Sequence, residues 1–435
     1  MFFSAAYEAE KAGMSQERLD RIAPALSKYI SSGQIPGLIT AVARKGEVVH
    51  FEVQGFADVE QTVPLKKDSL FRIYSMSKPI TGVALMILIE EGKIRLTDPV
   101  SDYIPEFSGT EVLLVNEDET TSREKIKRPL TIRDLATHTS GIAYSFTANK
   151  PLQEIYKENK LSPYFFIDNL TTSAKDGSIQ VSSEKSFENI CAFSSALAKA
   201  PLMHQPGEKW TYSMGMDVLG CVIEKASGQT FDRFLEERIF APLGMTDTSF
   251  YVPKSKVDRF TNLYFYPGSI GNLIPGMEKF PKDLKMMLLD HRYTSPYLKP
   301  ATLFDGGSGL VSSTQDYLRF SQMLLNGGIL GKTRILSRKS VELFSTNHLS
   351  KKTTQNSNYY PEGMGFGITV GITSDIGLTG EHGSNGSYYW GGAASTLFWV
   401  DPEEDLVAVA MTQLMASPLP LRTEFTSLVY QAIDD

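Results

Sequence analysis

Ser75 and Lys78 lie one helical turn apart in the stretch FRIYSMSKPITGVALMILIEEGK, residues 71–93. A serine hydroxyl is a weak nucleophile until a neighbouring base takes its proton, and an unprotonated amine can be that base. Side chains three positions apart share one face of a helix, so this spacing brings the amine to the hydroxyl. The pair predicts a serine nucleophile with a lysine as its proton partner.

The Ser-x-x-Lys pattern occurs twice more, at Ser122/Lys125 and at Ser182/Lys185. Both of these copies lie in polar, charged stretches, which predicts solvated surface. Only the first copy precedes an apolar run, residues 80–88, which is hydrophobic over most of its circumference and is therefore expected to be a buried helix. The context of the pattern, and not the pattern itself, selects the first copy.

Pro79 indicates where the buried helix begins, because proline is tolerated in a first turn, where backbone N–H groups lack partners. Ser75 is then expected at the helix N-terminus, where free N–H groups and the helix dipole favour an alkoxide or an oxyanion. Burial and the dipole favour the neutral amine of Lys78, which can accept the proton of Ser75. A purely structural interpretation stays open at this point, in which Ser75 caps the helix and Lys78 reaches towards solvent.

The elements that must position this pair come from both ends of the chain. Residues 15–31 predict an amphipathic helix with Ser15 as N-cap and a kink at Pro24. Residues 37–58 form two β-rich runs around a Lys-Gly turn, which predicts a hairpin. Residues 388–413 predict two further strands around the turn DPEED, followed by a helix over residues 418–433. These patterns predict an α+β fold, an antiparallel sheet flanked by helices.

The middle of the chain, residues 80–300, shows mainly helical patterns, including a helix with a Pro/Gly stop in SGQTFDRFLEERIFAPLGM. Residues 145–205 and 250–300 lack a clean periodicity and are predicted to be long loops over a cleft. We therefore expect an α/β sheet subdomain from residues 1–79 and 301–435. A mostly helical subdomain, residues 80–300, is inserted into it.

Composition restricts the partners of the chain. The 435 residues carry a net charge of -7, and 42% of them are hydrophobic, as in ordinary soluble globular proteins. Without a basic excess, neither nucleic acid nor an anionic membrane is an expected partner. The six histidines show no metal-ligand spacing, and GGILGKT at residues 327–333 follows a helix and has the wrong glycine spacing for a phosphate loop. No metal and no cofactor are expected.

Cys191 and Cys221 are the two cysteines of the chain. Two cysteines are too few for a disulfide framework or a zinc site, so both are predicted to be reduced and buried. The first sixteen residues show neither the basic region nor the apolar region of a signal peptide, and no run of eighteen apolar residues occurs. The expected location is the cytoplasm, although a signal removed upstream of residue 1 stays open.

Five stretches, the first of which contains Ser75 and Lys78, occur in this order: RIYSMSKPITGVAL, LTIRDLATHTSGI, PGEKWTYSMGMDVLG, FDGGSGLVSSTQDYLRFSQMLLNGG and YYWGGAASTLFWVDP. Together they resemble the serine β-lactamase-like superfamily over roughly residues 15–430. This superfamily includes class C β-lactamases, DD-peptidases, family VIII carboxylesterases and the lovastatin acyltransferase. The absence of a Gly-x-Ser-x-Gly motif argues against an α/β-hydrolase.

The resemblance implies roles for particular residues. Ser75 is the expected nucleophile, Lys78 its proton partner, and Tyr212 the tyrosine that shares the role of general base. Taken alone, Tyr212 could equally be a core aromatic with a satisfied hydroxyl. In the penicillin-recognising branches the tyrosine motif, Tyr-x-Asn, usually ends in Asn or Ser. Here its third residue is Met214.

The strand motif departs further, because Trp390, Gly391 and Gly392 replace the usual Lys-Thr-Gly. The carboxylate-binding lysine of β-lactam enzymes is therefore missing, and Trp-Gly-Gly resembles the family VIII esterases. The glycines would allow close approach of the strand to substrate, and Trp390 would form an apolar wall. The N–H groups of Ala393 and Ser75 would form the oxyanion hole.

The expected function is a serine carboxylesterase acting on small, neutral, short-chain acyl esters. Three alternatives stay open: an acyltransferase to an alcohol acceptor, a β-lactamase or DD-peptidase, and an inactive binding protein with the same fold. The sequence leaves the physiological ester and the oligomeric state undetermined.

Overall fold

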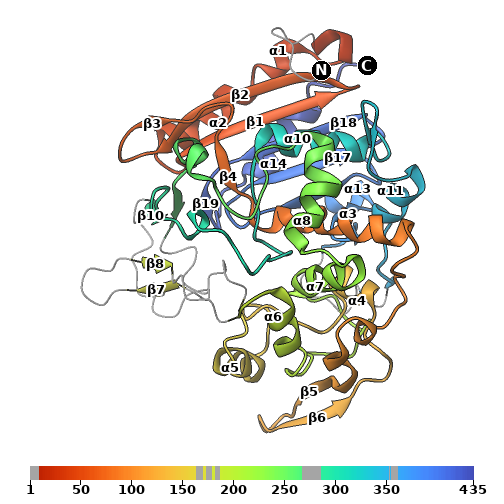
Figure 1. Cartoon of the computed structure of the whole chain (residues 1–435). Coiled ribbons are helices and arrows are strands. Elements are labelled where there is room, and N and C mark those ends of the chain that lie inside the picture. The colour runs from red at the N-terminus through yellow and green to blue at the C-terminus, as the bar shows by residue number, and fades with distance from the viewer. Residues whose placement is uncertain are drawn as a thin grey trace.

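The computed structural model describes residues 9–162, 170–172, 179–181, 187–266, 286–351, 353 and 361–435. Its largest sheet is antiparallel, with the strand order β14-β15-β16-β17-β18-β1-β2-β3 (Figure 1). The pairing of β1 with β18 joins the two ends of the chain in the middle of this sheet. The strands are β1 (Gly37–Arg44), β2 (Glu47–Asp58), β3 (Val63–Pro64), β14 (Met364–Phe366), β15 (Gly371–Thr373), β16 (Tyr388–Gly391), β17 (Leu397–Asp401) and β18 (Leu406–Met411).

The two predicted hairpins are confirmed. Lys45 and Gly46 connect β1 to β2 with φ values of 51° and 79°, the left-handed backbone that a tight two-residue hairpin needs. β17 pairs with β18 across the DPEED turn. The predicted count for residues 388–413 is one strand short, because Tyr388–Gly391 forms a strand of its own, β16, which pairs with β17.

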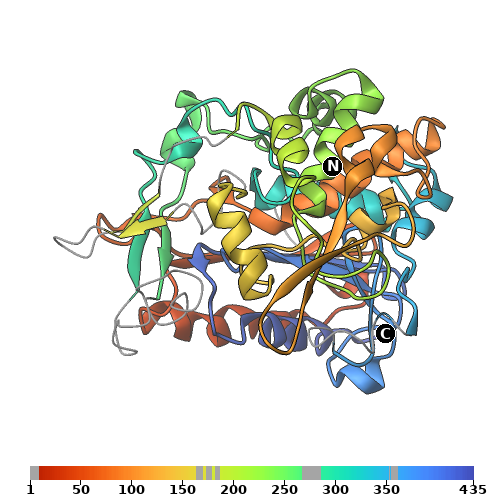
Figure 2. The same ribbon diagram turned by 90° about the horizontal axis from the view of Figure 1, so that it is seen from below.

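Helices cover both faces of the sheet. On one face α2 (Ile22–Ser31) packs beside α14 (Leu421–Tyr430), seen as the red and blue helices along the bottom of Figure 2. On the other face lie α10 (Thr314–Leu325) and α3 (Ser77–Glu90). The alternation of β-strand side chains explains this arrangement, because successive residues face the two separate apolar clusters. The predicted α+β fold is confirmed.

The N-terminal helix is divided. Ser15 caps α1 (Gln16–Leu19) by accepting a hydrogen bond from the N–H of Arg18. The chain then breaks at Asp20, and Pro24 lies in the first turn of α2. The predicted cap is therefore confirmed, but the predicted kink is a complete break placed ahead of the proline, because a proline in a first turn does not interrupt hydrogen bonds.

Helices of the central region lie below the sheet in Figure 1. The prediction of long loops is wrong over residues 145–205 where α5 (Lys150–Glu158) and α6 (Ile190–Leu197) form, and over residues 250–300 where β9 (Leu263–Phe265) and β10 (Met287–Asp290) form. Other parts of both predicted loops, including Ser182/Lys185, lie outside the described residues. The predicted subdomain boundaries stay a prediction. The helices here are α4 (Ile132–Ala136), α5 (Lys150–Glu158), α6 (Ile190–Leu197), α7 (Gly215–Ser227), α8 (Phe231–Leu235) and α9 (Ala241–Leu243), with a π-helical turn at Glu236–Phe240.

Shorter elements complete the fold. Ser122 and Lys125 are exposed on β6, as predicted for this copy of the Ser-x-x-Lys pattern. The remaining strands and helices are β4 (Leu70–Arg72), β5 (Glu111–Val115), β6 (Thr121–Lys125), β7 (Leu170–Thr172), β8 (Ile179–Val181), β9 (Leu263–Phe265), β10 (Met287–Asp290), β11 (Val311–Ser313), β12 (Ile329–Leu330), β13 (Thr333–Arg334), β19 (Leu414–Met415), α11 (Arg338–Phe344) and α13 (Ile376–Thr379).

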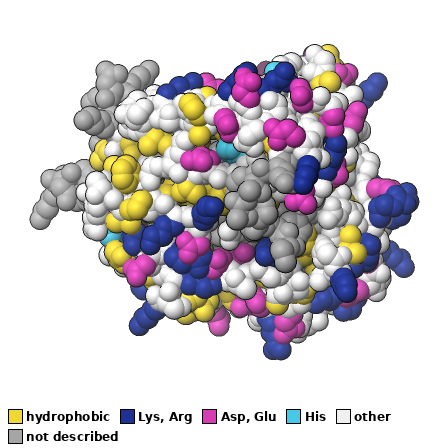
Figure 3. All heavy atoms as spheres, turned by 90° about the horizontal axis from the view of Figure 1, so that it is seen from above, with side chains coloured by type: hydrophobic (Ala, Val, Ile, Leu, Met, Phe, Trp, Pro, Cys, Tyr) yellow, Lys and Arg dark blue, Asp and Glu magenta, His cyan; other side chains and the backbone are white. Residues whose placement is uncertain are grey.

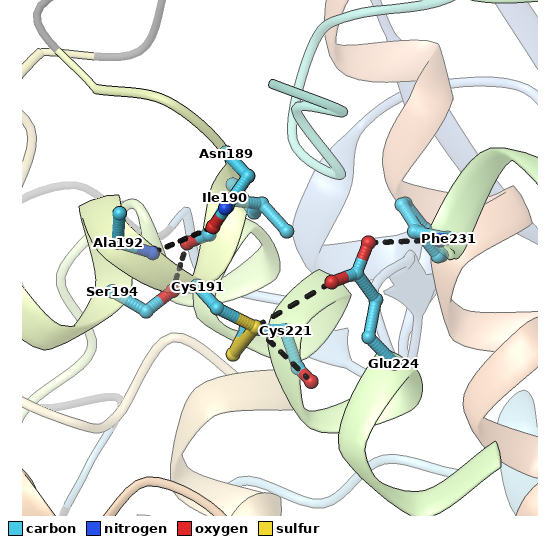
Figure 4. Close-up of a disulfide and its surroundings, with 8 residues drawn as sticks. All are labelled: Asn189, Ile190, Cys191, Ala192, Ser194, Cys221, Glu224 and Phe231. Atoms are coloured by element: carbon cyan, nitrogen blue, oxygen red, sulfur yellow. Dashed lines mark hydrogen bonds between the residues drawn. A yellow bond between two sulfur atoms is a disulfide. The ribbon is translucent and has the colours of Figure 1, made fainter. Parts of the chain in front are cut away.

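Cys191 and Cys221 form a disulfide, so the prediction of two reduced thiols is wrong (Figure 4). The two Cα atoms lie 4.9 Å apart because α6 and α7 pack against each other, which is within the range a disulfide requires. The carboxylate of Glu224 lies 3.5 Å from the sulfur of Cys191. Disulfides persist mainly in oxidising compartments. The cysteines therefore give no support to the predicted cytoplasmic location, which stays a prediction.

The surface carries both signs of charge. On the face drawn in Figure 3, Lys and Arg side chains alternate with Asp and Glu side chains. Mixed charge of this kind gives no extended positive field on that face. Within the described residues no helix has both the length and the apolar character needed to cross a membrane.

Candidate active site

Ser75 lies in a single 3₁₀ turn, Tyr74–Met76, directly ahead of α3. Tyr74 has a φ of 41°, an uncommon backbone conformation that turns the chain sharply before the serine. The residues after it are held in place: the hydroxyl of Tyr317 donates to the carbonyl of Met76, at 2.8 Å. Pro79 lies in the first turn of α3, as predicted. The serine is thus held at the start of a buried helix.

Lys78 is fully buried, with 0% of its surface exposed. Its Nζ donates to the Oγ of Ser75 at 3.0 Å and to the carbonyl oxygen of Gly307 at 2.7 Å. The same nitrogen lies 4.8 Å from the ring centroid of Tyr212 and 5.4 Å from that of Tyr144. Two hydrogen bonds and two aromatic faces therefore fix the amine against the serine.

Tyr212 approaches Ser75 from the other side, across 137 positions of sequence. Its hydroxyl donates to the Oγ of Ser75 at 2.6 Å. The loop that carries it is anchored by its own backbone: Thr147 Oγ1 donates to the Tyr212 carbonyl at 2.8 Å, and the N–H of Thr211 donates to the His138 carbonyl at 2.8 Å. The structure thus brings Ser75, Lys78 and Tyr212 within hydrogen-bonding distance of one oxygen.

His138 supports Tyr212, a contact that the sequence reasoning did not assign. The imidazole packs edge-on against the Tyr212 ring, with 4.8 Å between centroids, and its Nδ1 accepts a hydrogen bond from the N–H of Ser213. Burial lowers the pKa of His138 well below its ordinary value, and the nearby Lys78 adds to this shift. His138 is therefore a neutral ring that orients the tyrosine.

Two buried carboxyl groups, those of Asp217 and Asp305, lie behind Lys78, and sequence reasoning missed both. Each accepts a hydrogen bond from the N–H of Gly307, at 3.1 Å and 2.7 Å. Burial, together with the charge of Asp305, raises the pKa of Asp217 well above its ordinary range. Asp217 lies in the stretch PGEKWTYSMGMDVLG and Asp305 in the stretch that begins FDGGSG. Their spacing along the chain does not indicate that the two carboxyl groups meet.

The strand motif forms the edge of the site opposite Lys78. At Gly392 a Cβ atom would lie 2.3 Å from the carbonyl oxygen of Ile73, so only glycine permits the strand to pack against the turn that carries Ser75. Trp390 lies 5.8 Å from Tyr212 and 5.4 Å from Phe366, measured between ring centroids. Gly391, which ends β16, is exposed to the pocket.

Backbone donors are available beside the serine. Within the described residues, neither the N–H of Ser75 nor that of Ala393 donates to another backbone carbonyl. Both residues line the same pocket. Free N–H groups at such positions are the kind of donor that stabilises a developing oxyanion.

A pocket of about 510 Å³ opens over Ser75, within the usual range for small-molecule sites. Its lining near the serine is aromatic. The lining also contains a cation that the motifs did not predict, Arg422, which stacks on the Tyr389 ring at 4.0 Å and pairs with Glu381 at 3.4 Å. Among the parts of the chain that the structure describes, no cluster of three or more His, Cys, Asp or Glu side chains could hold a metal ion.

A serine held between a buried lysine and a tyrosine, at the edge of an antiparallel sheet flanked by helices, defines the class of protein as a serine hydrolase of the β-lactamase fold. The chain belongs to the beta-lactamase family, whose family model matches residues 16–431. The resemblance inferred from the motifs, to the β-lactamase-like superfamily and its family VIII esterases, is confirmed.

Relatives extend over nearly the whole chain. Protein Rv1367c of Mycobacterium tuberculosis is 30% identical over 402 residues, covering 91% of this chain and 90% of that protein. Esterase EstB of Burkholderia gladioli is 28% identical over 420 residues, covering 93% of each chain. Among solved structures, EstCE1, described as a hydrolase with promiscuous acyltransferase activity, superposes with a TM-score of 0.73 at 25% identity, covering 95% of this chain and 99% of that one.

Proposed function

We propose that the protein is a serine carboxylesterase that hydrolyses small, neutral acyl esters through an acyl-enzyme on Ser75. The observation that carries the proposal is the convergence of the Lys78 amine and the Tyr212 hydroxyl on the Ser75 oxygen, at 3.0 Å and 2.6 Å. A nucleophile and its base within hydrogen-bonding reach are the geometric requirement for covalent catalysis.

The reaction proceeds in two steps. Ser75 loses its proton to the Lys78/Tyr212 pair as its oxygen attacks the ester carbonyl, and the same pair returns a proton to the departing alcohol. Water then enters, gives a proton to the pair and attacks the acyl-enzyme, which releases the acid and regenerates the serine. Burst kinetics are expected wherever the second step is the slower one.

The oxyanion of each tetrahedral intermediate is assigned to the N–H groups of Ser75 and Ala393. Each such donor contributes on the order of 3 kcal/mol to lowering the barrier. Gly391 and Gly392 support this role by keeping the strand free of side chains beside the carbonyl group.

The lining of the pocket supports neutral substrates. Its wall near Ser75 includes aromatic side chains such as Phe146 and Trp390, and the cation in the lining, Arg422, is already paired with Glu381. The relative EstB is named as an esterase, which supports an ester substrate.

Replacement of Ser75 tests the proposal. Ser75→Ala should abolish p-nitrophenyl butyrate hydrolysis, by at least about 1,000-fold, and should abolish labelling by a fluorophosphonate probe located by peptide mass. Ser122→Ala is the matched control, because Ser122 belongs to the exposed Ser-x-x-Lys copy on β6. Full hydrolysis by Ser75→Ala would refute the assignment. Labelling of a different serine would refute it as well.

Acyl transfer to an alcohol is the second candidate, favoured by the acyltransferase activity described for EstCE1. It would use the same residues, with an alcohol in place of water. Added acceptor alcohols separate the two, because a transferase forms the new ester in preference to the free acid. A rate of nitrocefin hydrolysis comparable to that of ester hydrolysis would instead favour a β-lactamase, and no labelling and no turnover would favour a binding protein.

A further inference from the structure

Behind Lys78 lie two buried carboxyl groups, those of Asp217 and Asp305, to which the proposed reaction assigns no role. Lys78, Asp217 and Asp305 each have 0% of their surface exposed. They meet at one peptide group: the carbonyl of Gly307 accepts from Lys78 at 2.7 Å, and the N–H of Gly307 donates to both carboxyl groups. Hydrogen bonds in series through a peptide polarise one another, so the carboxyl groups act on the amine through Gly307.

The two carboxyl groups have unequal partners. Asp305 accepts from the N–H groups of Gly307 and Ser308, at 2.7 Å and 2.8 Å, and from the hydroxyl of Ser308. Asp217 accepts from the N–H of Gly307 through Oδ1, and within the described residues its buried Oδ2 has no hydrogen-bond partner. Three donors stabilise a carboxylate, whereas an unsolvated oxygen favours the protonated acid.

The arrangement leaves little room for a side chain at Gly307. A Cβ atom there would lie 3.0 Å from Oδ2 of Asp217 and 3.0 Å from the Tyr144 hydroxyl. A side chain at position 307 would therefore crowd the Asp217 carboxyl group beside the peptide that bonds Lys78.

Other titratable groups also face this cluster. Tyr144 and Tyr212 present their rings to Lys78, and His138 lies close enough to it for its pKa to respond. Burial raises the pKa values of Tyr144 and Tyr297, which lie near the carboxyl groups, so both phenols are neutral at ordinary pH. The pair of carboxyl groups is thus the source of negative charge on this side of Lys78.

We propose that Asp217 and Asp305 are positioning residues that hold one proton between them. The single negative charge, on Asp305, acts through Gly307 to keep Lys78 a cation. Lys78 in turn stabilises Tyr212 as a phenolate, which accepts the proton when Ser75 attacks and so becomes a neutral phenol. This inference rests on the proposed function for the identity of the nucleophile, and it goes beyond that function by naming what sets the charge of the base.

Two isosteric variants test the proposal through the pH dependence of fluorophosphonate labelling at Ser75, a readout that requires no knowledge of the natural ester. Asp305→Asn removes the charge, which eases proton loss from the base, so the acidic limb of the labelling rate should move to lower pH by about one unit or more. Asp217→Asn replaces a neutral acid by a neutral amide, so the limb should stay within about 0.3 unit of wild type.

A residue with a merely structural role would change the labelling rate without moving the limb. Equal shifts in both variants, or no shift in Asp305→Asn, would overturn the proposal. Kinetics of p-nitrophenyl butyrate hydrolysis, measured in parallel, should show the same limb in kcat/KM.

The wild-type protein supplies a test that survives misfolding of either variant. Infrared spectra recorded at pH 8 with carboxyl-labelled aspartate should show the isotope-sensitive C=O stretch of a protonated, buried aspartic acid. Asp316, whose pKa burial raises to about 6, is ionised at that pH and does not contribute. Absence of the band would overturn the proposal, whereas absence of labelling at Ser75 in wild type would overturn only the proposed function.

Discussion

The aromatic wall of the pocket differs in composition from the buried cluster behind the pocket lining, which is called the floor here. The floor consists of Lys78, Asp217 and Asp305, which are fully buried and bonded to the peptide of Gly307. The wall around Trp390 is aromatic, half-buried and open to the pocket. Charges lie where water is excluded, and apolar surface lies where a ligand can displace water.

This difference separates the energetics of the two regions. Electrostatic interactions are strongest away from water, so the floor is expected to determine the rate of the chemical step. Apolar contact contributes roughly in proportion to the area buried, so the wall is expected to determine how tightly a substrate binds. Variants of the floor should therefore change mainly kcat, and variants of the wall should change mainly KM.

Lys78→Met gives the largest expected effect, because it removes the floor's contact with Ser75. We expect kcat to fall by about 1,000-fold or more with little change in KM, since Lys78 supports the proposed general base and such bases contribute about 100- to 10,000-fold. Steady-state kinetics with p-nitrophenyl butyrate measure this effect. Lys125→Met, in the exposed copy of the pattern, is the control and should match wild type. A variant that raised only KM would place Lys78 in binding, and the comparison would fail.

Cys191→Ser should act on the scaffold behind the floor. The disulfide joins α6 to α7 across 30 positions, and closing a loop of that length stabilises a fold by about 3 to 4 kcal/mol in the chain-entropy model. We expect denaturant unfolding to show a loss of this size, with kcat/KM of the folded fraction unchanged. Cys221→Ser should lose the same amount as Cys191→Ser. Unchanged stability in both variants would mean that the bond contributes nothing to the fold.

Trp390→Ala gives the smallest expected effect and tests the wall. Loss of the indole removes apolar contact with the substrate, so KM should rise about tenfold while kcat stays within about a factor of two. Trp390→Phe, which keeps an aromatic face, should recover most of the loss. A large fall in kcat at unchanged KM would show that the wall takes part in the chemical step, and the separation of the two regions would break down.

Much of the site could be predicted because its signals are local. The spacing of Ser75 and Lys78, the proline that follows them and the apolar run together predicted that Ser75, the proposed nucleophile, lies at the start of a buried helix, and two hairpins were visible in their turns. The strand β16 was missed because Tyr388–Gly391 is short and carries two of its aromatic residues towards opposite faces. No local period distinguishes such a segment from a loop.

By itself, the sequence determined the family, the fold class and the residues of one helical turn, because neighbours along the chain are neighbours in space over that distance. Only the tertiary structure decided that Cys191 meets Cys221, and that Asp217 and Asp305 meet at Gly307. Contacts between distant segments depend on how whole helices and loops pack, and the spacing within either segment does not encode that packing.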